Sequence, residues 1–81
     1  MKRMLNTLYI MTHESYVNRE GQALVIRVNK EDKLKVPIIT ISAVVCFGNV
    51  LVTPKALELC TDNEVTITYL SYYGRFMARI Q

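Results

Sequence analysis

The sequence has no tryptophan, and its 81 residues include a single histidine, two cysteines and three isolated glycines. Two cysteines are too few for the disulfide framework of a small secreted domain, and neither has the closely spaced Cys or His partners of a zinc site. Cys46 and Cys60 both lie among apolar residues, so we expect reduced thiols in the core in preference to a disulfide. Glycines that stand alone form no phosphate-binding loop.

Long hydrophobic runs are also missing. The longest apolar stretches fall well short of the roughly 20 residues of a membrane-spanning helix, and polar residues between Asn6 and Glu14 interrupt any signal-peptide core. We therefore expect no membrane contact and a cytoplasmic location.

The composition, 51% hydrophobic and 21% charged, is that of a globular domain, and a chain of this length forms one domain at most. Ten basic and seven acidic residues give a net charge of +3. This balance is compatible with nucleic-acid binding, but the basic residues are scattered and form no obvious cluster.

Short β-branched and aromatic runs separated by turn signals predict a mainly β chain with one short helix. We expect a small antiparallel β-sandwich or half-open barrel of about seven or eight strands. The expected strands cover residues 4–11, 15–19, 22–28, 33–38, 41–47, 50–52, 65–69 and 75–80. The helix should begin after an N-cap at Thr53, with Pro54 in the first position, and stop at Asp62-Asn63, where Asn tolerates a left-handed conformation.

Alternation assigns faces to several of these strands. Residues 4–11 are apolar on both faces, which indicates a strand buried on two sides or lying in a dimer contact. Leu34, Val36 and Ile38 should point inward, and Pro37 should lie at a sheet edge because it cannot donate a ladder hydrogen bond. The polar cluster 29–32 should be an exposed turn. In the last strand Phe76, Ala78 and Ile80 should oppose Arg75, Met77 and Arg79.

No catalytic constellation emerges from the residues. The single histidine, His13, precedes Glu14, and adjacent strand residues point to opposite faces. Neither Ser15 nor Ser42 has a second histidine to serve as a base. The carboxylates are interpreted as solubilising charges and not as a metal site; they are Glu31, Asp32, Glu58, Asp62 and Glu64. We predict no catalytic residue, no metal ligand and no cofactor in these residues.

Two groups of residues have the chemistry to bind nucleic acid. Arg75 and Arg79, two strand repeats apart, should share a face and could contact phosphates, although ordinary surface arginines are the favoured interpretation. Arg27 is a further candidate. Tyr69, Tyr72 and Tyr73 could stack on bases, or simply pack across strands.

Several stretches in order resemble one family. They are Leu5-Asn6-Thr7-Leu8-Tyr9, the hairpin through Glu20-Gly21, Leu34-Lys35-Val36-Pro37, Val44-Val45-Cys46-Phe47-Gly48, Thr53-Pro54 with its helix, and Tyr73-Gly74-Arg75-Phe76-Met77-Ala78-Arg79-Ile80. Taken together they resemble the amino-terminal β domain of the CRISPR-associated integrase Cas1, of the kind that accompanies type I-C systems.

The resemblance implies a parent that is a Mg- or Mn-dependent DNA endonuclease and integrase. With its partner Cas2, such a protein inserts spacers into a CRISPR array as part of antiviral defence. It implies a homodimer that binds double-stranded DNA, weakly in this part of the chain. The family's Glu, His and Asp metal ligands belong to a carboxy-terminal helical domain, so none transfers to residues 1–81. Some relatives place an aromatic wedge after the first strand, and His13, Tyr16 or neither could correspond.

The expected domain organisation is a single β domain over residues 1–81. Because Gln81 falls inside an amphipathic strand, we expect a fragment that lacks the helical catalytic domain. Two other hypotheses remain open at this point: a free-standing small β-barrel that binds single-stranded nucleic acid, and a purely structural dimerisation domain.

Overall fold

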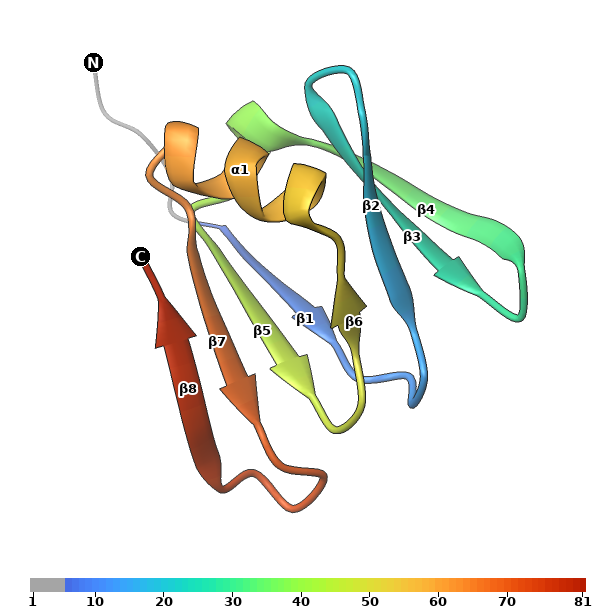
Figure 1. The fold of residues 1–81 in the computed structure, drawn as a ribbon, viewed down its shortest axis with the longest axis vertical. Helices are drawn as coiled ribbons and strands as arrows, with labels where there is room; N and C mark the ends of the chain where they lie inside the picture. The colour runs from blue at the N-terminus through green and yellow to red at the C-terminus, as the bar shows by residue number, and fades with distance from the viewer. Residues whose placement is uncertain (1–5) are drawn as a thin grey trace.

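The computed structural model describes residues 6–81 and divides them into two four-stranded sheets and one α-helix (Figure 1). Sheet A has the strand order β1-β5-β7-β8, and sheet B the order β4-β3-β2-β6. The bounds are β1 Thr7–Ile10, β2 Tyr16–Glu20, β3 Ala23–Val28, β4 Glu31–Pro37, η1 Ile38–Thr40, β5 Ala43–Phe47, β6 Leu51–Val52, α1 Pro54–Asp62, β7 Thr66–Leu70 and β8 Phe76–Ile80. The predicted mainly β class with one helix is confirmed.

The two sheets are mixed and not antiparallel as predicted. β2, β3 and β4 form an antiparallel meander and β8 pairs antiparallel with β7, but β5 runs parallel to β1 and to β7, and β6 runs parallel to β2. The parallel pairs arise from crossovers, because the chain builds the meander before it returns to β1, and passes through α1 before it returns to β5. Such pairings join distant segments, so local patterns do not reveal them.

One core lies between the sheets and also takes in α1. Sheet A contributes Ile10, Val44, Cys46 and Ile67 from its inner face. Sheet B and the helix complete the core with Val17, Leu24, Ile26, Val52, Ala56, Leu59 and Cys60. Because the buried face of α1 belongs to this same core, the helix leaves the outer face of sheet A uncovered.

Both cysteines are buried and free, as predicted. Burial raises the pKa of each thiol to about 11, since the charged thiolate would lose its hydration.

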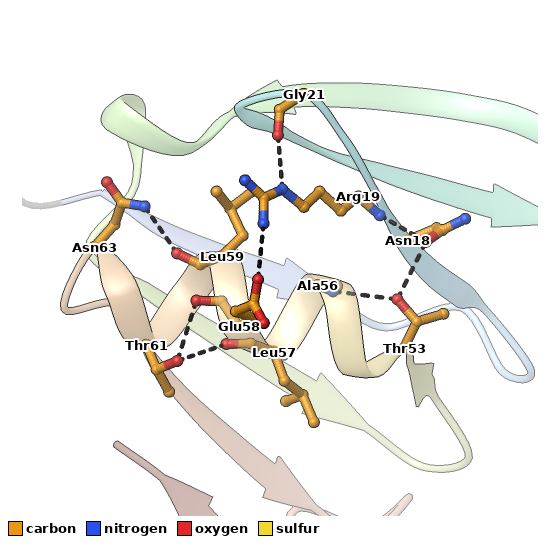
Figure 2. Close-up of polar contacts among 10 residues, drawn as sticks. All are labelled: Asn18, Arg19, Gly21, Thr53, Ala56, Leu57, Glu58, Leu59, Thr61 and Asn63. Atoms are coloured by element: carbon orange, nitrogen blue, oxygen red, sulfur yellow. Dashed lines mark hydrogen bonds and ion pairs between the residues drawn. The ribbon is translucent and has the colours of Figure 1, made fainter.

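The helix is fixed at both ends by side chains (Figure 2). Thr53 accepts a hydrogen bond from the Ala56 N–H at 3.2 Å and donates to Asn18 of β2 at 3.1 Å, so the predicted N-cap also ties α1 to sheet B. The helix ends at Asp62 and Asn63 donates back to the Leu59 carbonyl at 2.8 Å. The left-handed residue is Glu64, with φ of 57°, and not Asn63, whose amide serves as a cap instead.

Charged side chains of sheet B form ion pairs on both of its faces. Arg19, the register partner of the core residue Leu24, reaches both the Gly21 carbonyl at 2.8 Å and Glu58 on α1 at 3.4 Å (Figure 2). Lys35 on β4 pairs with Glu20 on β2 at 2.9 Å, across β3. This pair spans the buried Val25, which explains why β3 is buried on both faces although the core covers only one of them.

Some assignments at the edges of sheet B need correction. Pro37 lies on an edge strand, as predicted, and Val36 and Ile38 pack in or against the core. Leu34 pairs with the core residue Ile26 and so faces inward as predicted, but at this edge its side chain stays half exposed. The turn is confined to Asn29-Lys30, both with positive φ as a two-residue hairpin requires, and Glu31 and Asp32 belong to β4.

The first strand is shorter than predicted and is not buried on both sides. Within β1, Ile10 lies in the core, whereas Tyr9 points to the outer face. Met4 and Leu5 fall outside the described residues. The dimer contact offered as the alternative remains a prediction.

No helix among residues 6–81 is long and apolar enough to cross a membrane.

Candidate nucleic-acid interface

Three loops gather at the end of the molecule opposite α1 (Figure 1). They follow the carboxyl ends of the three parallel strands β1, β5 and β7, and parallel strands bring those ends to one edge of the sheet. The Glu14 N–H donates to the Asn49 carbonyl at 2.9 Å, and the Gly48 N–H to the Leu70 carbonyl at 2.9 Å, so all three loops are joined by backbone hydrogen bonds. We call this region the loop end: residues 11–15, 48–50 and 71–75.

Aromatic rings pack together at the loop end. The rings of His13 and Tyr72 meet edge to face with centroids 6.0 Å apart, and Tyr72 meets Tyr73 in the same way at 5.6 Å. Gly48 makes room for them: its φ is +75°, and a Cβ there would lie 3.3 Å from Tyr72 Cδ2 and 3.5 Å from His13 Nδ1. Tyr73 is 94% exposed. The loop end therefore presents exposed aromatic rings on loops that are joined by hydrogen bonds.

Ser71 shapes the loop between β7 and β8. Its hydroxyl accepts hydrogen bonds from the N–H groups of Tyr73 and Arg75 at 3.3 and 3.0 Å. Its own N–H donates to the Arg75 carbonyl at 2.6 Å, which closes the loop at the start of β8. These bonds hold the backbone of Tyr73 and Arg75 at the loop end, with both side chains exposed.

A β-bulge alters the faces of β8. Tyr69 pairs with Ala78 and Leu70 with Phe76, so Met77 is an extra residue and the alternation breaks there. Phe76 consequently lies on the same face as Arg79, whose guanidinium is 5.8 Å from its ring centroid. The prediction that Phe76 shares a face with Ala78 and Ile80 is wrong for this reason. That Arg75 and Arg79 share a face stays a prediction, because Arg75 lies before the first residue of β8.

Arg79 lies on the outer face of sheet A, beside Thr68 of β7. Its Nε donates to the Thr68 hydroxyl at 3.4 Å. Within the described part of the chain neither Arg75 nor Arg79 forms an ion pair. Both charges are therefore available to a phosphate.

Arg27 and Tyr16 form a separate cluster on sheet B. They are direct cross-strand partners, and the guanidinium lies 5.9 Å from the tyrosine ring centroid. Arg27 also donates from Nε to Asp32 at 2.8 Å, and this hydrogen bond and charge raise the pKa of the arginine. Since its charge is already matched by a carboxylate, Arg27 is a weaker candidate for phosphate than Arg75 or Arg79.

The five predicted binding residues thus lie in three places. His13 and Arg75 lie at the loop end, Arg79 on the outer face of sheet A, and Tyr16 with Arg27 on sheet B. Tyr69 packs against the core, as its packing interpretation proposed, but Tyr72 and Tyr73 are exposed. Phe76 was not predicted as a binding residue, because simple alternation places it on the face of Ala78 and Ile80 and does not reveal the bulge that puts it on the outer face.

Among residues 6–81, no three His, Cys, Asp or Glu side chains form a group that could hold a metal ion. Two of the carboxylates interpreted as solubilising charges form ion pairs, Glu58 with Arg19 and Asp32 with Arg27.

Comparison with known proteins gives a consistent result. The family model described as CRISPR associated protein Cas1 matches residues 8–81. The chain is 36% identical over its whole length to CRISPR-associated endonuclease Cas1 1 of Chlorobaculum tepidum, and 35% identical to CRISPR-associated endonuclease Cas1 2 of Rhodospirillum rubrum. It spans 24% of the length of each of these relatives.

Solved structures share the fold at lower identity. A partial Cas6-RT-Cas1–Cas2 complex superposes with a TM-score of 0.89 at 14% identity, over 96% of this chain and 24% of that one. A TtCas1–DNA complex superposes with a TM-score of 0.79 at 21% identity, over 93% of this chain and 28% of that one. The match of the family model over nearly the whole chain, with the relatives' sequence identity, shows that this chain belongs to the Cas1 family of CRISPR-associated proteins.

Proposed function

We propose that this chain is the amino-terminal β domain of a Cas1 spacer-acquisition integrase, and that it presents its loop end to the end of a DNA duplex. The domain supports DNA capture and dimerisation, while catalysis belongs to a helical domain elsewhere in the longer protein. The type I-C setting, the cytoplasmic location, the partnership with Cas2 and the use of Mg or Mn by the whole protein are parts of the same proposal. The relatives' names as endonucleases and their fourfold greater length support it.

The observation that carries the proposal is the aromatic group at the loop end. His13, Tyr72 and Tyr73 lie together on loops joined by backbone hydrogen bonds. Arg75 belongs to the same loop as the two tyrosines and forms no ion pair among residues 6–81. Exposed rings can stack on the last base pair of a duplex, and a nearby arginine can bind its phosphates. His13 follows the first strand, which makes it the better candidate than Tyr16 for a wedge at the duplex end, because Tyr16 lies beside Arg27 on sheet B.

The test compares DNA with and without ends. A short blunt duplex and a dumbbell of the same sequence, closed by a loop at each end, are titrated with the chain. We expect weak binding to both and several-fold tighter binding to the open duplex. His13→Ala and Tyr73→Ala should remove this preference, whereas Tyr16→Leu, the matched change on sheet B, should keep it. Equal affinity of the unmodified chain for both DNAs would contradict the proposal.

The absence of catalysis in this domain is tested separately. Branched and linear DNA incubated with the chain and Mg²⁺ or Mn²⁺ should remain intact. Reproducible cleavage that His13→Ala abolishes would overturn the assignment of catalysis to another domain.

A further inference from the structure

The outer face of sheet A carries one charge on its four strands. The strand sequences Thr7–Ile10, Ala43–Phe47, Thr66–Leu70 and Phe76–Ile80 contain no Asp or Glu, and Arg79 is their sole Lys or Arg. The strands of sheet B, in contrast, hold both signs of charge in close pairs. An anionic ligand would therefore meet attraction and no repulsion from the strands of sheet A.

Register partners on neighbouring strands form rows of side chains across this face. One row crosses all four strands and the next crosses three. Tyr9 pairs with Val45, Val45 with Thr68, and Thr68 with Arg79. Paired residues point to the same side of a sheet, so these four form one row. The neighbouring row is Phe47, Leu70 and Phe76, again in register. The two rings at the margins are exposed, Tyr9 by 60% and Phe76 by 59%.

The rows suit an extended polyanion that has bases to stack. Tyr9 and Arg79 are separated by three strand spacings, about 14 Å, so a single strand of nucleic acid that contacts both must cross the whole sheet. Aromatic rings bind bases of any sequence by stacking, and an arginine beside a ring holds the intervening phosphate. A duplex hides its base faces inside the helix and offers no such contact except at its ends.

We propose that the outer face of sheet A binds an unpaired DNA strand, which crosses the sheet with bases on Phe76 and Tyr9 and a phosphate on Arg79. Phe76 begins β8 directly after the loop end. A strand separated from its complement at the loop end would pass directly onto this face. The site and the ligand differ from those of the proposed function, which concerns the duplex end.

Fluorescence anisotropy with single-stranded oligo-dT of about 12 nucleotides, a length within the range of OB-fold binding sites, measures the affinity. Phe76→Leu keeps the apolar bulk but removes the ring, and should weaken binding by about tenfold. Arg79→Gln should weaken it less and reduce the salt slope by about 0.7, the value for one phosphate on a single strand. Lys35→Gln on sheet B, a control whose charge is paired with Glu20, should leave both quantities unchanged.

Photo-crosslinking locates the strand directly. An oligonucleotide with 5-iodouracil should crosslink to peptides that contain Tyr9 or Phe76, and loss of the Phe76 crosslink in Phe76→Leu should accompany the loss of affinity. Crosslinks confined to His13, Tyr72 and Tyr73, or unchanged affinity in a folded Phe76→Leu chain, would overturn the proposal. A dimer in sedimentation that Phe76→Leu dissociates would also overturn it, by assigning the face to a second copy. Dumbbell and open-duplex binding report on the loop end separately, so the two proposals can fail independently.

Discussion

Sheets A and B have four strands each and share one core, yet the side chains on their outer faces differ in charge and polarity. On sheet B, β3 is covered by an ion pair from its two neighbours, and Arg27 is matched by Asp32. On sheet A the outer rows are apolar, aromatic or hydroxylic, and the one arginine contacts a ring and a threonine. A charge that is already paired within the protein contributes little to binding a ligand. Exposed aromatic rings and a cation without an ion-pair partner are, in contrast, free to contact one.

The largest expected effect is on the free energy of unfolding, when a substitution on the inner face of sheet A is compared with one on its outer face. Val44 and Val45 are neighbours on β5, but Val44 lies in the core and Val45 on the outer face. Val44→Ala should lower the free energy of unfolding by about 2–3 kcal/mol, through lost burial and a cavity, and Val45→Ala by about 1 kcal/mol or less. Urea denaturation of both variants measures the difference. Equal losses would mean that the outer face is packed as tightly as the core.

A second comparison concerns one glycine from each sheet's loops. Gly21, in the β2–β3 hairpin, and Gly48, at the loop end, both have positive φ, but only Gly48 has neighbours that a Cβ would meet. Each change to Ala should cost about 1–2 kcal/mol for the left-handed backbone. Gly48→Ala should in addition displace the Tyr72 and His13 rings, seen as shifted ring signals in NMR spectra, and weaken binding to duplex ends. An unchanged aromatic spectrum in Gly48→Ala would show that the rings do not depend on this glycine.

The core thiols give a pH-dependent prediction for the inner face. Cys46 and Cys60 have a pKa near 11 when folded, against about 9 when unfolded. The unfolded chain therefore loses protons first, and stability present below pH 9 should fall as the pH rises towards 11, by about 1 kcal/mol per thiol at pH 10. Urea unfolding at pH 7 and pH 10 measures the loss. A Cys46→Ala/Cys60→Ala chain is the control, and an equal pH dependence in it would assign the loss to other groups.

The smallest effect comes from giving sheet B an unpaired cation. Asp32→Asn removes the carboxylate that Arg27 binds, so the sheet B surface should gain affinity for DNA of any form by about two- to threefold, with a salt slope steeper by about 1. Salt titrations of binding by anisotropy provide the measurement. No change would show that the guanidinium stays held by Tyr16 alone.

The features that the sequence predicted correctly are those that depend on short-range interactions along the chain. The hairpin around Gly21, the Thr53-Pro54 helix start and the edge position of Pro37 depend on residues within a few positions of each other. The parallel pairing of β1, β5 and β7 depends on which distant segments meet, and alternation contains no information on that. The bulge at Met77 belongs to the same class, since it exists only relative to β7. For that reason the sequence predicted Arg79 and His13 as candidate binding residues but not Phe76.

The most direct test of the contrast between the sheets is a titration of the ¹⁵N-labelled chain with a duplex that carries an unpaired overhang, followed by NMR. We expect shifted amide signals at the loop end, in Gly48 and Tyr73, and along the outer row of sheet A, in Tyr9, Thr68 and Arg79. The amides of Arg27 and Asp32 on sheet B should not move. Shifts centred on Arg27 and Asp32, with sheet A unperturbed, would contradict this expectation.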